Sequence, residues 1–573
     1  MYLFVCNKMS IRTNKMKAVG VVMKQLPIAR SKFHERGGDD ESFDGKLEKL
    51  RLNLYKIKDV FERVKKNEEE LLDRLVEVYG YLRKLERRKL DEEMDGICKR
   101  IRYSAQKLVP MNGFDESSKE EDPKPAQIFQ PSQHLHQPHQ ESWTKEVFDR
   151  LDDTIRGCLT SLLMFPENAV IRKSNAINLW IGEGLIDDAR EDLCEGVIHE
   201  LLESHMIVRC GNEKSPIVNK FRILPAVHRL LKSHVSNREA HLSIGFLIFR
   251  SKKARLVLEQ KRVTLGHSSF GGRTVFNIGA SYVNFRPKWV TELKNVAVLQ
   301  LGRWQDSPFH NIEVGSQEFL KELGNLTQLR YLSLRGISRI SELPSSIAHL
   351  WRLQILDLKA CHNLKTLPND ISSMKSLTHL ILSQCYLLEG MPKGIEKLNN
   401  LQVLKGFLIS TPEKTPCRIS DLVNLKNLRR LSIYIGREAV MRDREFEGLE
   451  DFVALEHLKI SWRGSNPSYG NIHLPRGLRK LHLECFPRKS FRELFMLPKM
   501  EDVLRVRELK ISRGKLERMD IDEKWLNVET LHLKYLKQLN LDVNNLKALF
   551  PRLGYIEIKQ IGNYDSYMEP TLD

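Results

Sequence analysis

The sequence predicts a mixed α and α/β protein, in which helical segments precede a long array of stacked repeats. Two apolar periods carry this prediction. From residue 47 to about residue 101, apolar residues recur at alternating steps of three and four, which is typical of amphipathic helices. From residue 329 onward, a pattern of leucines recurs every 24 residues, and a fixed period of that length indicates a solenoid.

The repeat is clearest in an L-x-x-L-x-L core. Leu329, Leu332 and Leu334 recur in phase at 353, 356 and 358, and again at 377, 380 and 382. Less regular copies continue to the unit at Leu553, and one at Val296 opens the array, which gives about eleven repeats. This core defines leucine-rich repeats, in which each unit is a short strand and a return segment. A single unit buries its apolar face only by stacking on its neighbours, so we predict one continuous core.

Frame positions three, five and seven of each repeat are expected to point out of the concave sheet. From the Leu329 unit to the Leu553 unit, nine of these positions are basic, four are acidic and several are aromatic. We predict a mildly basic binding face that suits an acidic protein surface; alternatively, any lysine-rich chain would show such a face. The predicted binding residues are Tyr331, Arg335, Lys359, Lys405, Phe407, Arg430, Tyr434, Lys459, Lys480, Lys510, Lys534 and Tyr555, and the acids are Asp357, Glu484, Glu508 and Glu557.

The N-terminal part divides into three expected segments. Residues 1–43 are a basic tail, which we interpret as disordered. Residues 44–109 form a helical, coiled-coil-like region, in which Glu68 interrupts the apolar seam; an intramolecular bundle and self-association both remain open. Residues 110–145 are rich in proline, glutamine and histidine and are expected to be a disordered linker, too flexible for its histidines to form a metal site.

Globular character returns in residues 146–236. Helical apolar spacing precedes two short strand-like runs, Met206 to Val208 and Phe221 to Leu224, and this order suggests a winged-helix-like module. Residues 237–290 are expected to be a connector and a cap for the array. The repeats themselves are assigned to residues 291–573.

Composition excludes several functional classes. The net charge of +18 allows a nucleic-acid, membrane or acidic protein partner, but no nucleic-acid-binding motif accompanies it. No apolar run reaches the ~20 residues of a membrane helix. The nine scattered cysteines form no C-x-x-C pair, which indicates free thiols rather than a metal site. Cys361 and Cys385 occupy a packing position of the repeat. No catalytic motif is found, so we predict a protein that is not an enzyme and uses no cofactor or metal.

Four stretches carry a resemblance to a known family. Residues 158–167 read Cys-Leu-Thr-Ser-Leu-Leu-Met-Phe-Pro-Glu, and residues 179–186 read Leu-Trp-Ile-Gly-Glu-Gly-Leu-Ile. Both resemble the winged helix of plant coiled-coil-type nucleotide-binding leucine-rich-repeat resistance proteins. Residues 227–231, Val-His-Arg-Leu-Leu, look like that family's Met-His-Asp element, and residues 359–364, Lys-Ala-Cys-His-Asn-Leu, look like the repeats of RPP-type resistance-like proteins. The resemblance covers most of residues 150–573.

The departures from the family concern its nucleotide site. No stretch matches the phosphate-binding loop G-x-x-x-x-G-K-[ST]. Only 39 residues separate Val109 from Asp149, whereas a domain needs about 50–250. His228 matches the family's nucleotide-contacting histidine, but Val227 and Arg229 replace that histidine's Met and Asp neighbours. We therefore interpret His228 as a vestigial, structural residue.

These observations predict a non-catalytic recognition or scaffold protein of plant innate immunity that binds no nucleotide. Its expected partners are proteins, either with an acidic surface or another resistance protein, and no nucleic acid. The expected location is cytoplasmic, with nuclear and membrane-peripheral as alternatives. Two other functions remain open: a substrate adaptor of a ubiquitin ligase, although residues 150–200 lack the Leu-Pro opening of its helical module, and a generic signalling scaffold.

Overall fold

The computed structural model describes residues 146–561, apart from residues 187–190, 212–215, 237–240, 244–254, 267–269, 306–311, 438, 442–444, 464–471, 494, 497–504, 521–524 and 542–545, and short pieces between residues 22 and 54. The chain forms two compact units, residues 1–122 with 307–309, and the remainder. Most of the predicted tail, heptad region and linker lies outside the described residues, so those assignments stay predictions. In the first unit, Leu47, Leu50 and Leu54 are helical and buried.

A small module of helices and strands opens the described part of the second unit. Its antiparallel sheet has the order β1-β3-β2, and β2 and β3 are the strand pair predicted around residues 207 and 223. We call residues 153–236 the helical module. In chain order it contains α7 (Asp153–Leu162), β1 (Ile171–Arg172), α8 (Lys173–Glu183), α9 (Glu191–Glu203), β2 (Ile207–Cys210), β3 (Lys220–Ile223) and α10 (Pro225–Ser236).

Local sequence sets the ends of its helices. The Asp152 side chain accepts a hydrogen bond from the Thr154 amide at 2.8 Å, and this caps α7. Gly184 ends α8 with φ at +78°, a left-handed conformation that glycine adopts without a steric penalty. No helix among the described residues is long and apolar enough to cross a bilayer.

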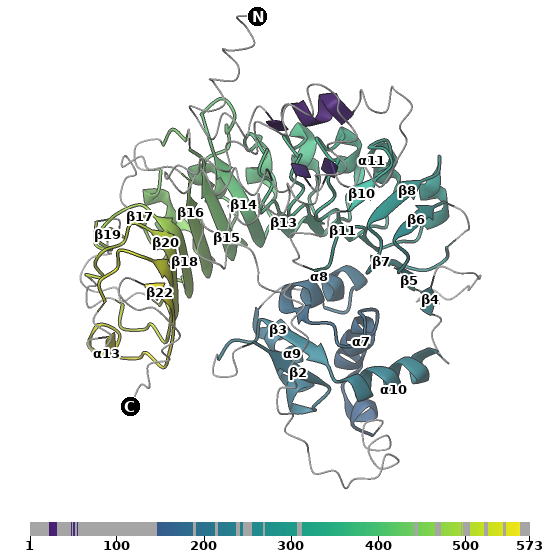
Figure 1. Cartoon of the computed structure of the whole chain (residues 1–573), viewed down its shortest axis with the longest axis horizontal. Coiled ribbons are helices and arrows are strands. Elements are labelled where there is room, and N and C mark those ends of the chain that lie inside the picture. Colours follow the sequence, from purple (N-terminus) through teal and green to yellow (C-terminus); the bar gives the residue numbers. More distant parts are fainter. Residues whose placement is uncertain are drawn as a thin grey trace, which may run out of the picture. The chain divides into compact units, whose positions relative to one another are not determined.

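The rest of this unit is a curved array of parallel strands (Figure 1). Within the described residues, 14 strands form one sheet, and all neighbours pair in parallel. In sheet order they are β4 (His241–Ser243), β5 (Arg255–Leu258), β7 (Thr274–Asn277), β9 (Val298–Gln300), β11 (Tyr331–Ser333), β12 (Ile355–Asp357), β13 (His379–Ile381), β14 (Val403–Ile409), β15 (Arg430–Ile435), β16 (His457–Trp462), β18 (Lys480–Phe486), β20 (Glu508–Gly514), β21 (Thr530–Leu536) and β22 (Tyr555–Ile561).

The array begins earlier than the sequence predicted. Strands β4, β5 and β7 lie in residues 237–290, which we expected to be a connector and cap, and β7 pairs in full register with β9. A small sheet of β6 (Arg262–Leu265), β8 (Tyr282–Phe285) and β10 (Glu313–Val314) accompanies them. The sequences of these units depart from the L-x-x-L-x-L pattern, because Lys253 and Gly272 replace the first leucine of the frame.

The chain returns through short 3-10 helices. Helices η4 (Ser345–His349) and η5 (Asn369–Ser373) follow Pro344 and Pro368, whose φ angles are −68° and −65°. The proline ring imposes such angles and removes a backbone donor. The Leu-Pro step therefore ends the extended segment and starts the return.

Two cysteines bridge neighbouring repeats. The Sγ atoms of Cys361 and Cys385 each lie 3.1 Å from a carbonyl oxygen of the preceding repeat, on Leu334 and Leu358. Both side chains are buried, and burial raises the pKa of Cys385 to about 12. The thiols therefore stay protonated, which confirms the prediction that they are packing residues.

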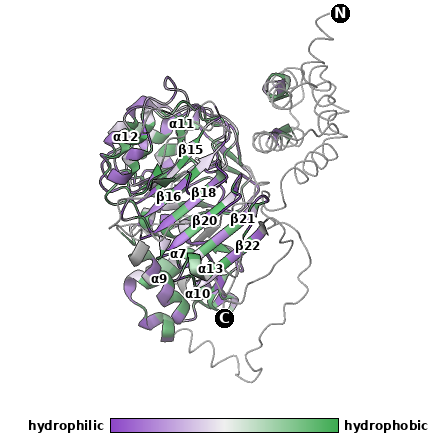
Figure 2. Ribbon diagram, turned by 90° about the vertical axis from the view of Figure 1, so that its left-hand side faces the viewer, coloured by the Kyte–Doolittle hydropathy of each residue, from purple (hydrophilic) through white to green (hydrophobic). Residues whose placement is uncertain are grey.

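One apolar core runs through the array from Leu258 to Ile556. Along the C-terminal strands, hydrophobic and hydrophilic positions alternate (Figure 2). The hydrophobic positions are the leucines and isoleucines that recur in the repeat frame, such as Leu481 and Leu483 in β18, and they are buried. This confirms that the repeats share one core.

Candidate protein-binding face

The candidate site is the sheet surface formed by frame positions three, five and seven, which we call the inner face. In β20 these positions are Glu508, Lys510 and Ser512, and they alternate with the buried Leu509 and Ile511. The strand registers align the same positions in every repeat from β15 to β22, so the side chains form continuous rows across the sheet. The array thus places the corresponding residues of successive repeats side by side on one surface.

The helical module packs against the N-terminal part of this face. A second apolar cluster joins module residues such as Trp180 and Ile181 to Val298, Tyr331 and Ile355 on the first strands. Gly182 of α8 permits the approach, because a Cβ atom there would lie 2.6 Å from Tyr331 Cβ and 2.9 Å from Val298 Cγ2. The contact is close enough that only glycine fits.

An ion pair ties the end of α8 to the sheet. Both carboxylate oxygens of Glu183 accept hydrogen bonds from Arg255, at 2.9 and 3.0 Å, and Oε1 also accepts from Thr274 Oγ1 at 2.8 Å. The Glu183 and Arg255 side chains are both about one-tenth exposed or less. Because the pair is buried and bidentate, losing either partner would leave a desolvated charge.

Asn175 adds a polar contact at the other end of α8. Its Nδ2 donates to the Trp304 carbonyl at 2.6 Å, and its Oδ1 accepts from Arg335 at 3.2 Å. Phe165 of the module packs edge-on against Trp304 and Phe276, with ring centroids 5.2 and 5.0 Å apart. The module is therefore held by apolar, aromatic and polar contacts together.

This packing corrects the expected role of Tyr331 and Arg335. We predicted that both contribute to a partner-binding surface, but they are only 5% and 4% exposed because the module lies against them. Lys359 lies in the same region, where burial and the charges of Arg335 and Arg172 lower its pKa well below the ordinary value. The first strands are thus used for internal packing.

Phe407 also differs from its expected position. Gly406 adopts φ of +89°, and the β14–β15 register shifts between Lys405 and Phe407, which marks a bulge. The extra residue inverts the following positions, so Phe407 and Ile409 enter the core and are fully buried. Phe407 is therefore a core residue and not an aromatic anchor of the inner face.

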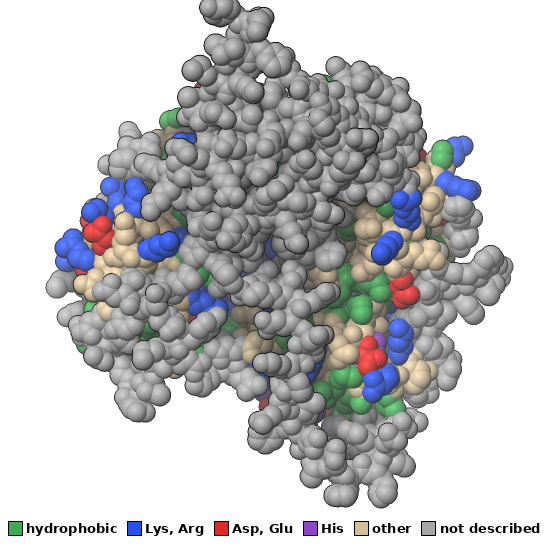
Figure 3. All heavy atoms as spheres, in the orientation of Figure 1, with side chains coloured by type: hydrophobic (Ala, Val, Ile, Leu, Met, Phe, Trp, Pro, Cys, Tyr) green, Lys and Arg blue, Asp and Glu red, His purple; other side chains and the backbone are tan. Residues whose placement is uncertain are grey.

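The remaining predicted residues come together on β14 to β22, where three carboxylates organise the lysines. Glu484 binds Lys459 at 2.9 Å and Arg513 at 3.3 Å. Glu557 binds Lys534 at 2.6 Å, Lys559 at 3.3 Å and His532 at 2.8 Å. Figure 3 shows one surface of the molecule, on which Lys, Arg, Asp and Glu side chains (blue and red) are exposed together at the left, where the C-terminal repeats lie.

The third carboxylate, Glu508, lies between the other two. It faces Lys480 at 3.8 Å and His532 Nε2 at 3.7 Å. Burial alone would raise the pKa of Glu557, but hydrogen bonds from His532 and Lys534 outweigh it and hold that pKa well below its ordinary value. Glu557 is therefore charged at neutral pH, and all three carboxylates lie close to more than one basic side chain.

Two tyrosines remain as aromatic groups of this surface. The Arg463 guanidinium carbon lies 4.5 Å from the ring centroid of Tyr434. Tyr555 packs edge-on against His532, with ring centroids 5.8 Å apart. Both tyrosines are partly exposed. Rigid aromatic side chains beside charged groups are typical of protein-binding surfaces. Arg430, on the same strand as Tyr434, is also partly exposed.

Sequence reasoning missed the histidines of the inner face. His379, His457, His482 and His532 all occupy frame positions three or five, but they were not counted with the charged residues. His482 is bonded to Ser512 Oγ at 3.2 Å, and burial lowers its pKa well below the ordinary value. The repeat frame itself was the signal that could have found them.

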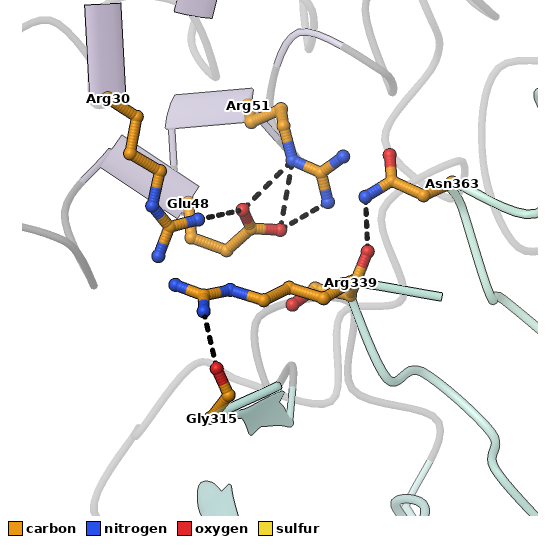
Figure 4. Close-up of polar contacts among 7 residues, drawn as sticks. Arg30, Glu48, Arg51, Gly315, Arg339 and Asn363 are labelled. Atoms are coloured by element: carbon orange, nitrogen blue, oxygen red, sulfur yellow. Dashed lines mark hydrogen bonds and ion pairs between the residues drawn. The ribbon is translucent and has the colours of Figure 1, made fainter. Parts of the chain in front are cut away.

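Other polar clusters of the described residues stabilise local structure. In the first unit, Glu48 accepts from Arg51 Nε at 3.0 and 2.9 Å and from Arg30 at 3.5 Å (Figure 4). In the second unit, Arg339 donates to the Gly315 carbonyl at 3.1 Å and Asn363 donates to the Ser338 carbonyl, which joins successive outer turns (Figure 4). The described residues contain no group of three His, Cys, Asp or Glu side chains arranged to hold a metal ion.

His228 lies inside the helical module. Its Nε2 atom is 2.9 Å from the Phe165 carbonyl oxygen, and the side chain is buried. Burial lowers its pKa, so the imidazole is neutral at neutral pH. The contact gives His228 a structural role, as its Val and Arg neighbours suggested.

Comparison with known proteins agrees with this architecture. A model of a leucine-rich repeat region matches residues 281–558. Disease resistance RPP13-like protein 4 of Arabidopsis thaliana is 27% identical over 454 residues, which cover 73% of this chain and 50% of that protein. The chain thus spans about half the length of this curated relative.

Solved structures of repeat proteins are also similar. A leucine-rich-repeat protein of Leptospira interrogans has 19% identity and a TM-score of 0.35, covering 53% of this chain and 83% of that one. The repeat ectodomain of the Arabidopsis thaliana receptor kinase GASSHO1/SCHENGEN3 has 14% identity and a TM-score of 0.29, covering 54% and 42%.

The parallel sheet, the repeat frame and the matching family model define a leucine-rich-repeat protein. The relationship with the Arabidopsis thaliana relative points to a narrower class: over most of its length the chain is similar to RPP-type resistance-like leucine-rich-repeat proteins.

Proposed function

We propose that this chain is a non-catalytic recognition protein of plant innate immunity, which binds a protein partner on the inner face of strands β14 to β22. The observation that carries the proposal is the surface of these strands. Two partly exposed tyrosines lie there beside Arg463 and His532, on the strands that carry the shared ion pairs. The first strands, in contrast, are packed against the helical module. Aromatic anchors within a charged surround suit a specific protein interface.

The helical module supports the kinship with resistance proteins. Its order of helices and strands, α7-β1-α8-α9-β2-β3, is that of a winged helix, and α8 carries the Trp-Ile-Gly-Glu-Gly motif. Two residues of this motif, Gly182 and Glu183, contact the repeat array. We infer that the module is a fixed part of the array. Self-association is proposed to use residues 44–109.

The proposed recognition does not use a nucleotide. The sequence has no phosphate-binding loop, and the histidine of the Met-His-Asp-like element is bonded to the Phe165 carbonyl. Calorimetric titration of the full chain with ADP and with ATP tests this directly. We expect no heat of binding at micromolar nucleotide, and micromolar affinity for either nucleotide would contradict the proposal.

The binding face is tested by affinity purification from plant tissue, with and without pathogen challenge. Tyr434→Ala together with Tyr555→Ala should abolish recovery of the partner, because hot-spot aromatics dominate such interfaces. Trp351→Ala is the matched control, since Trp351 is an exposed aromatic residue that follows η4 in the return segment. Partners retained by the double variant, or lost equally in the control, would exclude this face.

The proposal places the protein in the cytoplasm, where the reducing environment suits its free thiols. Cys158, Cys361, Cys385 and Cys417 are buried and form no disulfide within the described residues. Expression of the full chain fused to a fluorescent protein tests the location, and exclusive accumulation outside the cell would contradict it.

A further inference from the structure

Frame position five forms a row of mainly basic side chains across the inner face. The strand registers place the seven members next to one another, one per strand: Lys405, Ser432, Lys459, His482, Lys510, His532 and Glu557. We call them the middle row. Its three lysines recur on every second strand, β14, β16 and β20, because β18 lies between the last two. The row therefore has a regular spacing of positive charge.

Two of these lysines form no ion pair with a carboxylate of the described residues, although Asp357 lies near Lys405, and Glu508 and Glu557 lie near Lys510. Lys459 binds Glu484, but no ion pair or hydrogen bond joins the ammonium group of Lys405 or Lys510 to any residue in the described part of the chain. The neighbouring carboxylates are already shared, Glu484 with Arg513 and Glu557 with Lys534. Both lysines are partly buried, so each ammonium group has lost part of its hydration. An incoming anion would restore the missing interaction.

The spacing of the row selects the shape of a ligand. Neighbouring strands lie about 4.8 Å apart, so lysines on every second strand are about 10 Å apart. A polyproline II segment advances 3.1 Å per residue with three residues per turn, which places every third side chain on one face about 9.3 Å apart. Side chains on one face of a β-strand repeat at only about 7 Å. An extended segment with three residues per turn thus matches the row.

A helix also repeats at about 10 Å over two turns, but its carbonyl groups are already hydrogen-bonded. The backbone of a polyproline II segment has no internal hydrogen bonds. Ser432 lies between Lys405 and Lys459 and offers a hydroxyl donor to such a backbone. The middle row therefore favours the extended form.

The chemistry of the row favours spaced carboxylates over a dense polyanion. Glu484 and Glu508 flank the row at positions seven and three, and Glu557 ends it. A nucleic-acid backbone, with a phosphate on every nucleotide, would place negative charges against these carboxylates. A segment with one acid in three places its charges only at the lysines.

We propose that the middle row binds an acidic protein segment in the polyproline II conformation, with carboxylates three residues apart on Lys405, Lys459 and Lys510. This inference rests on the proposed function of the inner face as a protein-binding surface. It names the ligand chemistry: a segment of the form Glu-x-x-Glu-x-x-Glu. Each carboxylate forms an ion pair with one lysine, and the two remaining residues of each turn lie over the strand between.

The environment of the two unpaired lysines makes binding depend on pH. Burial lowers the pKa of Lys405 to about 8, assisted by Arg430 and Lys359 and opposed by Asp357. Burial and the charges of Lys534 and Lys459 lower the pKa of Lys510 to about 8, whereas Glu557 and Glu508 oppose this change. His482 and His532 flank Lys510 on the two neighbouring strands. A bound carboxylate raises both pKa values. Binding at pH 8 should therefore take up protons and should weaken as the pH rises further.

The test is fluorescence anisotropy of the full chain with labelled peptides. The probe is (Glu-Pro-Pro)3, and its control is a peptide of the same composition with the three glutamates clustered at one end. We expect the spaced peptide to bind at least about tenfold more tightly, and more weakly as salt is added. Equal affinity for the two peptides, or tighter binding of a peptide bearing phosphoserine in place of the glutamates, would overturn the proposal.

Matched lysine variants assign the binding to the row. Lys405→Met with Lys510→Met should reduce affinity for the spaced peptide by about tenfold or more, since methionine keeps the length of the side chain and removes its charge. Lys375→Met should have no effect, because Lys375 lies in the return segment, where it donates to the Lys397 carbonyl. Thermal melting of each variant verifies folding. Unchanged binding in the folded double variant would overturn the assignment.

Failure of this inference differs from failure of the proposed function. If neither acidic peptide binds but Tyr434→Ala with Tyr555→Ala still abolishes partner recovery, the inner face is a recognition surface and the row inference is wrong. If the spaced peptide binds through Lys405 and Lys510, but the Tyr434→Ala, Tyr555→Ala variant recovers as much partner as the wild-type chain, the peptide site stands and the proposed interface is wrong. Calorimetry at pH 8 in two buffers of different ionisation enthalpy measures the proton uptake, and its absence would also count against the lysine assignment.

Discussion

The two ends of the inner face use the same frame positions for opposite purposes. On β9 to β12 these positions include Val298, Tyr331 and Ile355, which are buried against the helical module. On β16 to β22 most of them are lysines, histidines and glutamates that remain partly exposed. The backbone geometry is the same at both ends, since all pairs are parallel and in register. The difference shows that side-chain chemistry, and not the solenoid, decides which strands pack internally and which can meet a partner.

The largest expected effect comes from the core that both ends share. Leu356→Arg removes roughly 1.5–3 kcal/mol of apolar burial and adds the cost of a buried charge. We expect the melting temperature to drop by several degrees or more. Val453→Arg is the control, because Val453 is 73% exposed and should tolerate the same side chain. Equal melting temperatures for the two variants would mean that the repeat phase is wrong.

The next effect concerns the ion pair that holds the module. Glu183→Gln leaves the Arg255 charge buried without its counter-charge, which costs about 3 kcal/mol. Glu195→Gln removes a surface partner of Lys173 and should cost less than about 1 kcal/mol. Urea denaturation measures both changes. Similar losses for the two variants would show that the buried pair does not distinguish the covered strands from the rest.

A smaller effect is expected at the closest approach of the module. Gly182→Ala places a Cβ atom against Tyr331 and should destabilise the packing by about 1–3 kcal/mol. Gly196→Ala, in α9, meets nothing within 4 Å and should stabilise the helix by up to about 1 kcal/mol. Changes of the same sign in both variants, measured by chemical denaturation, would argue against tight packing at Gly182.

The smallest expected effect concerns the ion pairs of Glu557, on the C-terminal strands of the inner face. Glu557 has a lowered pKa in the folded protein, so its ion pairs stabilise the fold above the carboxylate's ordinary pKa and are lost as the pH falls below it. Glu557→Gln should therefore destabilise the protein at pH 7, and the difference should shrink as the pH falls below the carboxylate's ordinary pKa, because the lowered folded-state pKa keeps part of the stabilisation down to strongly acidic pH. Thermal melting at about pH 7 and about pH 3 tests this. A difference between the two proteins that grows on acidification would reverse the sign.

The sequence predicted the repeat frame, because each leucine that faces the core recurs at a fixed interval and its burial does not depend on distant residues. It also predicted the packing cysteines and the strand pair of the module. The frame could not predict that Tyr331 and Arg335 are buried, since the covering helix lies some 150 residues earlier in the chain. The Phe407 bulge was local, and Gly406 ahead of a Phe-Leu-Ile run was its available signal.

The division of the inner face is tested most directly by hydroxyl-radical footprinting of the native full chain. Tyr331, Tyr434 and Tyr555 occupy equivalent surfaces of one sheet and have the same intrinsic reactivity, so their modification rates compare exposure alone. We predict that Tyr434 and Tyr555 are modified while Tyr331 is protected, and that Glu183→Gln increases labelling of Tyr331. Modification of Tyr331 as fast as Tyr555 in the wild-type chain would contradict the account.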